Sequence, residues 1–380
     1  MEFGQGAVED VVMHGTFITQ AFRGRKVLVT GHTGFKGSWL SLWLHSLGAR
    51  ITGYGLAPAT DPSNFVVSQV RDVLEGHYEA DVRNIASLHA AIDQSDPDVI
   101  FHLAAQSLVR ESYAAPLETF DTNVMGTVNL LEVLRRQAKP CVVVVVTSDK
   151  CYANREQVWG YREKDAMGGH DPYSASKGAT ELVVASYRHS FFPPDKLGQH
   201  RVKLASARAG NVIGGGDWSR DRIVVDLVTH LAQGKPVPVR NPRAVRPWQH
   251  VLEPLSGYLS LAAWMLLSDG MKYCAAWNFG PRAGGEATVQ ELVERFCQAW
   301  GGGRWVDVSD PQQPHEASIL RLSIDKAAWE LQWQPMWNLA QTVARTAAWY
   351  RRFYERPTES MRTVCLADLE AFMGAQPTAA

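Results

Sequence analysis

Tyr173 and Lys177 stand four residues apart in the stretch Tyr-Ser-Ala-Ser-Lys. On a helix, residues at this spacing project from one face, so both side chains can act on one bound molecule. A phenol has an ordinary pKa near ~10, and a neighbouring ammonium lowers that pKa toward the working range of a general base. Asp171 and Pro172 fit the N-cap and the first position of such a helix. The pair is a candidate acid/base couple, although this spacing is also common on ordinary helices.

A glycine-rich segment near the start of the chain predicts a phosphate-binding turn. An apolar run, 26–30, is followed by Gly31, Gly34 and Gly37 and then by an amphipathic stretch, 38–47. In a strand–turn–helix unit, Gly31 would allow the turn, Gly34 would admit a pyrophosphate and Gly37 would let the helix pack closely. The spacing differs from the common G-x-G-x-x-G, so the pattern alone fits a structural turn as well as a cofactor site.

Five consecutive valines, 142–146, predict a strand that is buried on both faces. Ser148, Asp149 and Lys150 follow at its carboxyl end, which is the edge where parallel sheets bind their ligands. The Ser148 hydroxyl is therefore expected to converge with the phenol of Tyr173.

Alternating apolar runs and helical patterns predict an α/β fold of the Rossmann type, a doubly wound parallel sheet with helices on both faces. The expected strands are 27–30, 51–54, 77–82, 99–103, 142–147 and 202–208.

The chain divides by composition, because prolines and tryptophans become frequent after Asn211. We expect a smaller C-terminal substrate-binding lobe there. The expected segments are a flexible N-terminal tail at 1–22, a dinucleotide-binding domain at 23–210 with a return to the sheet near 275–282, and a mainly substrate-binding lobe at 211–370.

Composition narrows the function classes. The 380 residues are 46% hydrophobic and 20% charged, and a net charge of −1 without a long basic run argues against nucleic acid or a membrane surface as partner. Five scattered cysteines lack metal-ligand spacing, so we expect reduced thiols and no bound metal. Residues 1–20 do not resemble a signal peptide, and no stretch is apolar enough to span a bilayer, so a cytoplasmic location is expected.

Together these motifs resemble the extended short-chain dehydrogenase/reductase family, which contains NAD-dependent epimerases and dehydratases of nucleotide sugars. Within that family, the chain is closely similar to the 4,6-dehydratases that act on CDP-glucose. The segments that carry the resemblance are 31–40, 147–152, 168–173, 207–218 and 246–251.

The resemblance implies NAD as the cofactor. By this resemblance the cofactor-binding residues are Gly31, Thr33, Gly34, Phe35, Lys36, Gly37, Asp81, Val82, Leu103, Ala104, Ala105, Gln106, Asn123, Tyr173 and Lys177. The second strand is followed by 54–58, which has no carboxylate for a ribose 2′-hydroxyl and no cation for a 2′-phosphate. NAD is preferred over NADP because the expected reaction returns its hydride.

The implied reaction begins with oxidation at the sugar C4. Tyr173 would remove the C4 hydroxyl proton, Ser148 would hold that oxygen, and Lys177 would lower the phenol pKa and bind the nicotinamide ribose. Loss of the C5 proton and the C6 hydroxyl would then give an enone, and hydride return to C6 would leave a 4-keto-6-deoxy sugar. This elimination needs one more acid and one more base, for which Asp149 and Lys150 are candidates in either order.

Substrate contacts are implied for Asn211, near the nucleotide phosphates, and for Arg246, whose planar fork suits a pyrophosphate. Weaker candidates are Arg222, His250, His315 and Glu316.

Three alternatives stay open: a nucleotide-sugar 4-epimerase, which would not use Asp149 and Lys150, a dehydratase of another nucleotide sugar, and an NAD-binding regulator without activity. The resemblance also implies a homodimer or dimer of dimers, formed through the Tyr173 helix and the helix after Asn123, and a product used for deoxysugars of surface polysaccharide.

Overall fold

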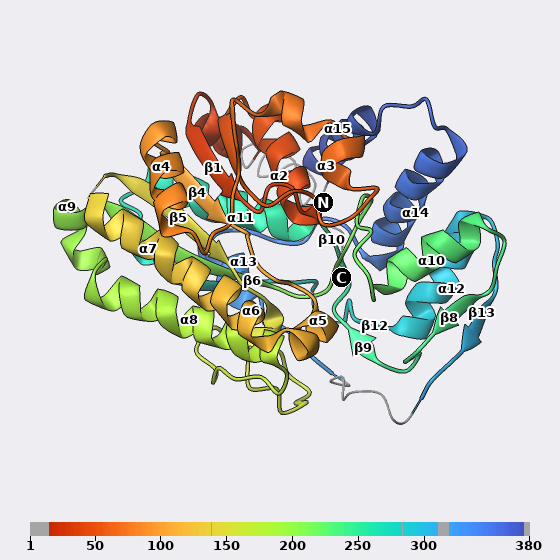
Figure 1. The fold of residues 1–380 in the computed structure, drawn as a ribbon. Helices are drawn as coiled ribbons and strands as arrows, with labels where there is room; N and C mark the ends of the chain where they lie inside the picture. The colour runs from red at the N-terminus through yellow and green to blue at the C-terminus, as the bar shows by residue number, and fades with distance from the viewer. Residues whose placement is uncertain (1–14, 138, 283, 311–318, 376–380) are drawn as a thin grey trace, which may run out of the picture.

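A seven-stranded parallel sheet forms the centre of the computed structural model, which describes residues 15–137, 139–282, 284–310 and 319–375 (Figure 1). Its strands are β1 (Lys26–Thr30), β2 (Arg50–Gly55), β3 (Gly76–Glu79), β4 (Val99–His102), β5 (Cys141–Val146), β6 (Val202–Ala209) and β11 (Ala276–Phe279). They lie in the order β11-β6-β5-β4-β1-β2-β3. The strand order reverses between β1 and β4, which is the point where open α/β sheets bind ligands. The predicted α/β fold is confirmed.

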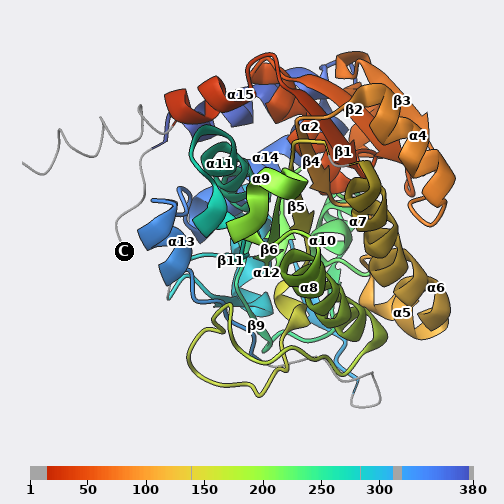
Figure 2. The same ribbon diagram turned by 90° about the vertical axis from the view of Figure 1, so that its left-hand side faces the viewer.

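The valine run of β5 is buried on both faces because helices cover both sides of the sheet (Figure 2). Val142, Val144 and Val146 face one hydrophobic core, and Val143 and Val145 face the other. The first core lies under α2 (Phe35–Ser46) and α11 (Leu252–Leu267). The second core lies under α4 (Ile85–Ser95), α7 (Gly126–Gln137) and α8 (Pro172–Ser190).

The other helices are α3 (Asn64–Val67), α5 (Val109–Ala114), α6 (Pro116–Phe120), α9 (Leu197–His200), α10 (Ile223–Ala232), α12 (Val289–Trp300), α13 (Asp325–Glu330), α14 (Leu339–Glu355) and α15 (Met361–Met373). Short strands are β7 (Val212–Ile213), β8 (Val237–Val239), β9 (Val245–Arg246), β10 (Gln249–His250), β12 (Ala287–Thr288) and β13 (Trp305–Asp307). Helices α10, α12 and α14 pack together beside the pair β8–β13 and form the smaller lobe, at the right in Figure 1.

The chain does not divide cleanly at residue 211, because two later helices belong to the sheet. Helix α11 is buried along most of its length and covers β5, β6 and β11. Helix α15 packs on α2, where Phe372 meets Trp43 with ring centroids 5.6 Å apart. Apolar side chains around all of α11 explain why it lies in the core and not in a solvated lobe.

The expectation of a flexible tail through residue 22 is wrong for residues 15–22, which form a helix. Ile18 and Phe22 of this helix are buried, and the Phe17 ring lies 4.7 Å from that of Trp264 on α11. The apolar spacing of these residues gives the segment one face to bury against the sheet layer.

None of the helices in the described part of the chain has both the length and the apolar character needed to cross a bilayer.

Candidate active site

Tyr173 and Lys177 lie in the first two turns of α8, as the spacing predicts. Asp171 caps this helix, accepting a hydrogen bond from the Ser174 amide over 2.9 Å, and Pro172 occupies the first helical position. Both Tyr173 and Lys177 are buried. The cap therefore fixes the start of the helix that carries the two side chains.

Ser148 meets Tyr173 from the carboxyl end of β5. The Ser148 hydroxyl accepts a hydrogen bond from the Lys150 amide over 3.2 Å and donates one to Asp149 Oδ1 over 3.0 Å. It is also within hydrogen-bond reach of the Tyr173 phenol, whose pKa it lowers. The fold thus brings together a hydroxyl and a phenol from two elements.

The predicted lowering of the Tyr173 pKa is wrong in this structure. Burial raises the pKa of Tyr173 to about 12, and the Ser148 hydrogen bond offsets only part of that effect. The physical reason is desolvation of the phenolate, to which the charge of Asp149 adds repulsion. In the protein alone, Tyr173 is a neutral phenol at neutral pH.

Lys177 is a buried cation with one carboxylate acting on it. Burial lowers the pKa of Lys177 to about 8, and the charge of Glu181, one turn later on α8, opposes this shift. His102 lies nearby on β4, where burial and the Lys177 charge lower its pKa to about 3. Its Nδ1 lies 2.8 Å from Thr30 Oγ1, so His102 is a neutral polar contact of the sheet and not an acid or base.

Asp149 is buried, and one of its carboxylate oxygens accepts no hydrogen bond from the described residues. Burial raises the pKa of its carboxyl even though the charges of Lys150, Arg246 and Lys36 lower it. Its Oδ2 atom has no hydrogen-bond partner among the residues described. A buried carboxyl with a raised pKa beside a phenol can act as a general acid toward a leaving group.

The glycine turn after β1 has the shape that a dinucleotide needs. Gly31 has φ +73°, and a Cβ there would lie 2.7 Å from the Ala104 amide nitrogen; a Cβ on Gly37 would lie 2.1 Å from the Gly31 carbonyl oxygen. A Cβ on Gly34 would meet nothing closer than 3.4 Å. Gly34 caps α2 without a side-chain hydrogen bond, so the first-turn amides can bind a phosphate.

Lys36 lies in that first turn, close enough to Asp149 and Lys177 for their charges to act on it. Burial and the charge of Arg222 lower the pKa of Lys36 to about 8, and Asp149 opposes the shift. A cation at the positive end of a helix is unfavourable unless anions lie near it. Asp149 and a bound phosphate are suitable anions.

The other predicted cofactor residues lie in or beside loops at the same edge of the sheet. Most of their polar side chains already bind other protein groups. Thr33 Oγ1 donates to the Leu56 carbonyl over 2.8 Å. Asp81 binds the Arg83 guanidinium, and Val82 is buried. Phe35 lies against the Gly214 backbone.

Asn123 ties the loop after β4 to α8. Its Nδ2 donates to the Gln106 carbonyl over 3.0 Å and to Ser176 Oγ over 2.8 Å, while its Oδ1 accepts from the Gln106 amide. The Gln106 side chain turns back onto Leu108 and Thr119. Leu103, Ala104 and Ala105 precede Gln106 in the loop that follows β4. Asn123 therefore fixes the loop after β4 against α8.

Two of the predicted substrate residues, Arg222 and Arg246, lie near the candidate catalytic residues Tyr173 and Asp149. Arg246 is close enough to lower the pKa of Asp149, and Arg222 that of Tyr173. The Arg222 Nε atom lies 3.1 Å from Asp217 Oδ2. The backbone carbonyl of Asn211, just before β7, accepts a hydrogen bond from the backbone amide of Gln249 in β10 over 3.1 Å.

His250 does not join this group. It has no exposed surface, and its ring lies between those of Trp39 and Trp337, with centroids 6.0 and 4.9 Å away. Burial lowers its pKa to about 3, so it is a neutral core residue. His315 and Glu316 lie outside the described residues.

Comparison with known proteins shows the family to which this chain belongs. The family model described as GDP-mannose 4,6 dehydratase matches residues 28–346. The chain belongs to this family. A CDP-glucose 4,6-dehydratase of Salmonella typhimurium is 49% identical over 330 residues, covering 87% of this chain and 91% of the relative. A dTDP-glucose 4,6-dehydratase of Streptomyces antibioticus is 30% identical over 345 residues, covering 86% and 92%.

A solved structure supports the fold of this dehydratase family member. The dTDP-glucose 4,6-dehydratase DesIV from Streptomyces venezuelae, solved with NAD and TYD bound, superposes with a TM-score of 0.73. The match covers 88% of this chain and 99% of that chain at 24% identity.

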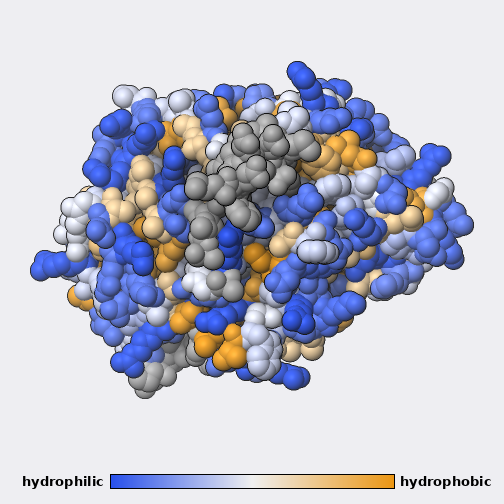
Figure 3. All heavy atoms as spheres, turned by 180° about the vertical axis from the view of Figure 1, so that it is seen from behind, coloured by the Kyte–Doolittle hydropathy of each residue, from blue (hydrophilic) through white to orange (hydrophobic). Residues whose placement is uncertain are grey.

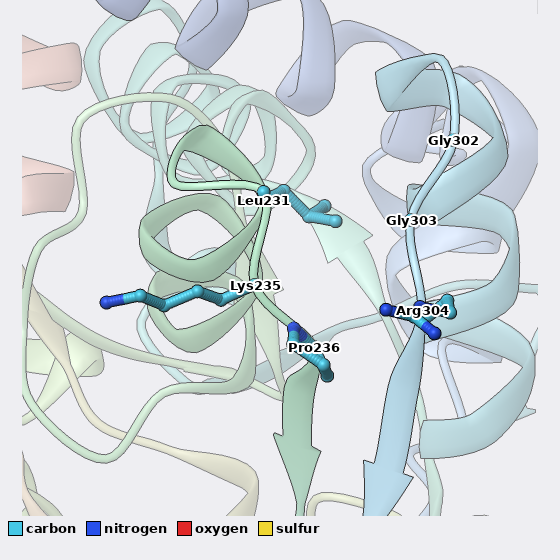
Figure 4. A pocket seen from close by; sticks show the side chains of 7 residues that line it. Leu231, Lys235, Pro236, Gly302, Gly303 and Arg304 are labelled. Atoms are coloured by element: carbon cyan, nitrogen blue, oxygen red, sulfur yellow. The ribbon is translucent and has the colours of Figure 1, made fainter.

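This chain also has a pocket outside the candidate active site. A pocket of about 360 Å³ lies where α10 and α12 end, lined by Leu231, Gly234, Lys235, Pro236, Gly302, Gly303 and Arg304 (Figure 4). None of these residues belongs to the catalytic group. Within the described ranges, no group of three His, Cys, Asp or Glu side chains is arranged to hold a metal.

Sequence reasoning missed Asp217, Glu181 and Arg208, which are buried charged residues near the dehydratase site. The signal for Glu181 was its position four residues after Lys177, on the same helix face. Arg208 and Asp217 lie on other elements and carried no such signal.

Proposed function

We propose that this chain converts CDP-D-glucose to CDP-4-dehydro-6-deoxy-D-glucose, as a hydro-lyase that uses NAD. The observation that carries the proposal is the position of Asp149, a buried carboxyl with a raised pKa, beside the Ser148–Tyr173 pair. An enzyme that only oxidises or epimerises at C4 has no use for such an acid. The 49% identity to a CDP-glucose 4,6-dehydratase favours CDP-glucose over other nucleotide sugars.

NAD fits the cradle formed by Gly31, Gly34 and Gly37, where a Cβ would be excluded at the first and last positions and open space remains at the middle one. When bound, it supplies the hydride acceptor for C4 oxidation and returns the hydride to C6. The first-turn amides of α2 and Lys36 would hold its phosphates. Lys177 would hold its nicotinamide ribose.

Ser148 and Tyr173 would hold the C4 hydroxyl of the sugar. Because Tyr173 is a neutral phenol in the protein alone, it becomes a base only when positive charge enters the site and favours the phenolate. Lys177 contributes such a charge as long as it is protonated. A bound oxidised nicotinamide would supply further positive charge to the site.

Asp149 would then protonate the departing C6 hydroxyl, since burial raises the pKa of its carboxyl and its Oδ2 atom has no partner among the described residues. Lys150, the next residue along the chain, would act as a neutral amine that removes the C5 proton and returns a proton to C5 when the hydride reaches C6. Arg246 and Arg222 would bind the nucleotide diphosphate, since both lie beside these groups and guanidinium forks suit phosphate oxygens. Asn211, at the end of β6, would contact the same phosphates.

The decisive experiment uses CDP-glucose carrying deuterium at C4. A 4,6-dehydratase moves that label to C6 of a 4-keto product, which absorbs in alkali. A 4-epimerase returns the label to C4, and a regulator without activity leaves the sugar unchanged. Parallel assays with dTDP-, UDP- and GDP-glucose test the nucleobase.

We also propose that two copies associate through α7 and α8, together with the neighbouring α6. Leu117 on α6 and Leu182 on α8 are 84% and 62% exposed, and Tyr113, Phe120 and Met125 extend this apolar surface. Outside the atoms drawn in grey, the opposite side of the molecule is mostly hydrophilic (Figure 3). A dimer through α7 and α8, or a dimer of such dimers, would bury the exposed leucines.

The division of labour we propose places the cofactor on residues 23–210 with β11, and the substrate mainly on the lobe of α10, α12 and α14. A cytoplasmic location is supported by five cysteines that are all buried free thiols. The product would enter synthesis of deoxysugars for surface polysaccharide.

A further inference from the structure

Glu181 is a buried carboxylate that joins three elements of the site. Its Oε1 accepts a hydrogen bond from Thr147 Oγ1 over 2.5 Å, and its Oε2 accepts one from Ser206 Oγ over 2.8 Å. The Arg208 guanidinium lies 2.7 Å from the same Oε2 atom, with both side chains almost fully buried. Glu181 thus links α8 to the carboxyl end of β5 and to β6.

Glu181 contacts the residue next to Ser148 and lies one helical turn after Lys177. Thr147 precedes Ser148, and Glu181 follows Lys177 by one turn on α8. Ser148 comes from β5, whereas Tyr173 and Lys177 come from α8, so their relative position depends on how these two elements are held together. The Thr147–Glu181 hydrogen bond is a direct link between them.

Arg208 anchors this link in the rest of the fold. Its Nη1 donates to the Tyr152 hydroxyl over 2.7 Å and to the Glu163 carbonyl over 3.0 Å. Burial alone would raise the pKa of Glu181, but Arg208 and the two hydroxyl hydrogen bonds outweigh it and lower the pKa. Glu181 is therefore charged.

We propose that Glu181 is a positioning residue for this reaction: it holds Ser148 in register with Tyr173 and keeps Lys177 as an ammonium ion. The inference rests on the proposed function. It assigns to one carboxylate a geometric role through Thr147 and an electrostatic role through Lys177.

Glu181 is the main charged group that stabilises the ammonium form of Lys177. The Cys151 thiol after β5 is buried with a raised pKa and is uncharged, and His102 on β4 is neutral. Lys36 on α2 is a like charge, since Lys177 lowers its pKa. Glu181 is the larger of the two groups that favour the Lys177 ammonium, and Cys151 would add to it only as a thiolate.

The test compares pH profiles of kcat for the wild type and Glu181→Gln. Loss of the carboxylate should lower the pKa of Lys177, so the alkaline limb should move to lower pH by about 1 unit or more. Glu181→Asp, which keeps the charge, should restore the limb. Glu355→Gln removes a carboxylate from an exposed Glu–Arg pair on α14 and should leave the profile unchanged.

A second variant separates geometry from charge. Thr147→Val removes the hydroxyl that joins β5 to Glu181 but leaves every charge in place, so kcat should fall about tenfold with the alkaline limb unmoved. Should Glu181→Gln fail to fold, Glu181→Asp and Thr147→Val carry the test. Wild-type kcat in Thr147→Val, or a Glu181→Gln profile lowered equally at every pH, overturns the inference.

A titration without substrate keeps this inference separate from the proposed function. NMR of ¹³C-labelled lysine, assigned by the signal that Lys177→Met removes, follows Lys177 in the folded protein. An acid shift of that titration in Glu181→Gln supports the electrostatic role, and an unchanged titration refutes it. Failure of the wild type to convert CDP-glucose would refute only the proposed function.

Discussion

The Ser148 hydroxyl donates a hydrogen bond to Asp149 Oδ1 over 3.0 Å, while Asp149 Oδ2 is left without a partner among the described residues. The residue proposed to hold the sugar C4 oxygen therefore also orients the proposed acid. Under that proposal, oxidation and elimination share one short segment at the end of β5. This arrangement lets the two steps be separated by mutation.

Asp149→Asn and Lys150→Ala should permit C4 oxidation but slow the elimination, because both groups act only after the ketone has formed. We expect the CDP-4-keto-glucose intermediate to accumulate, as measured by quenched-flow mass spectrometry. In heavy water the wild-type product should carry deuterium at C5, which must be reprotonated from an exchanged acid. Unlabelled C5 with the C6 hydroxyl retained would rule out a dehydratase.

Tyr173→Phe keeps the ring and removes the phenol that serves as the base. Turnover of CDP-glucose should fall by about 10²- to 10⁴-fold, the usual contribution of a general base, with little change in the melting temperature. Turnover near that of the wild type would place the base elsewhere.

Gly34→Val should weaken NAD binding strongly while the protein stays folded, since its φ of −78° suits any residue and its Cβ would meet nothing closer than 3.4 Å. Gly37→Val is the matched contrast, because its Cβ would lie 2.1 Å from the Gly31 carbonyl oxygen and disrupt the turn itself. Calorimetry of NAD binding and thermal unfolding distinguish the two effects. Unchanged NAD affinity in folded Gly34→Val would make the turn purely structural.

Lys177→Met should abolish activity and yet stabilise the fold at neutral pH. The folded pKa of Lys177 is about 8, below its unfolded value of 10.5, so the unfolded state binds more protons between these values and wild-type stability rises with pH there. Below pH 8 the wild type bears the full cost of burying the ammonium, at most about 3 kcal/mol. Denaturant unfolding should show the Lys177→Met advantage at pH 7 and its loss by pH 10.5.

Leu182→Glu should dissociate the proposed dimer, because it places a charge on the exposed apolar surface of α8. Sedimentation velocity measures the change in mass. Val306→Glu, at an exposed apolar position on β13 in the smaller lobe, is the control and should leave the mass unchanged. A wild-type chain that sediments as a monomer would contradict the proposal.

Short sequence patterns were enough to predict the fold class and the elements that carry Ser148, Tyr173 and the glycine turn. The valine run of 142–146 could only be a strand covered on both faces, and the cap at Asp171 fixed where the Tyr173 helix begins. The glycine spacing likewise predicted a turn whose first and last glycines admit no side chain. These features depend on backbone geometry and periodicity, which are properties of short segments.

The tertiary structure decided the electrostatics of the site and the place of residues far apart in the chain. The sequence predicts a Tyr173 of lowered pKa, whereas burial raises it to about 12, because desolvation depends on everything packed around the phenol. His250 lay in a suggestive motif but is enclosed between Trp39 and Trp337. The Glu181–Arg208 pair joins α8 to β6, and only the packing of helix on sheet brings the two charges together.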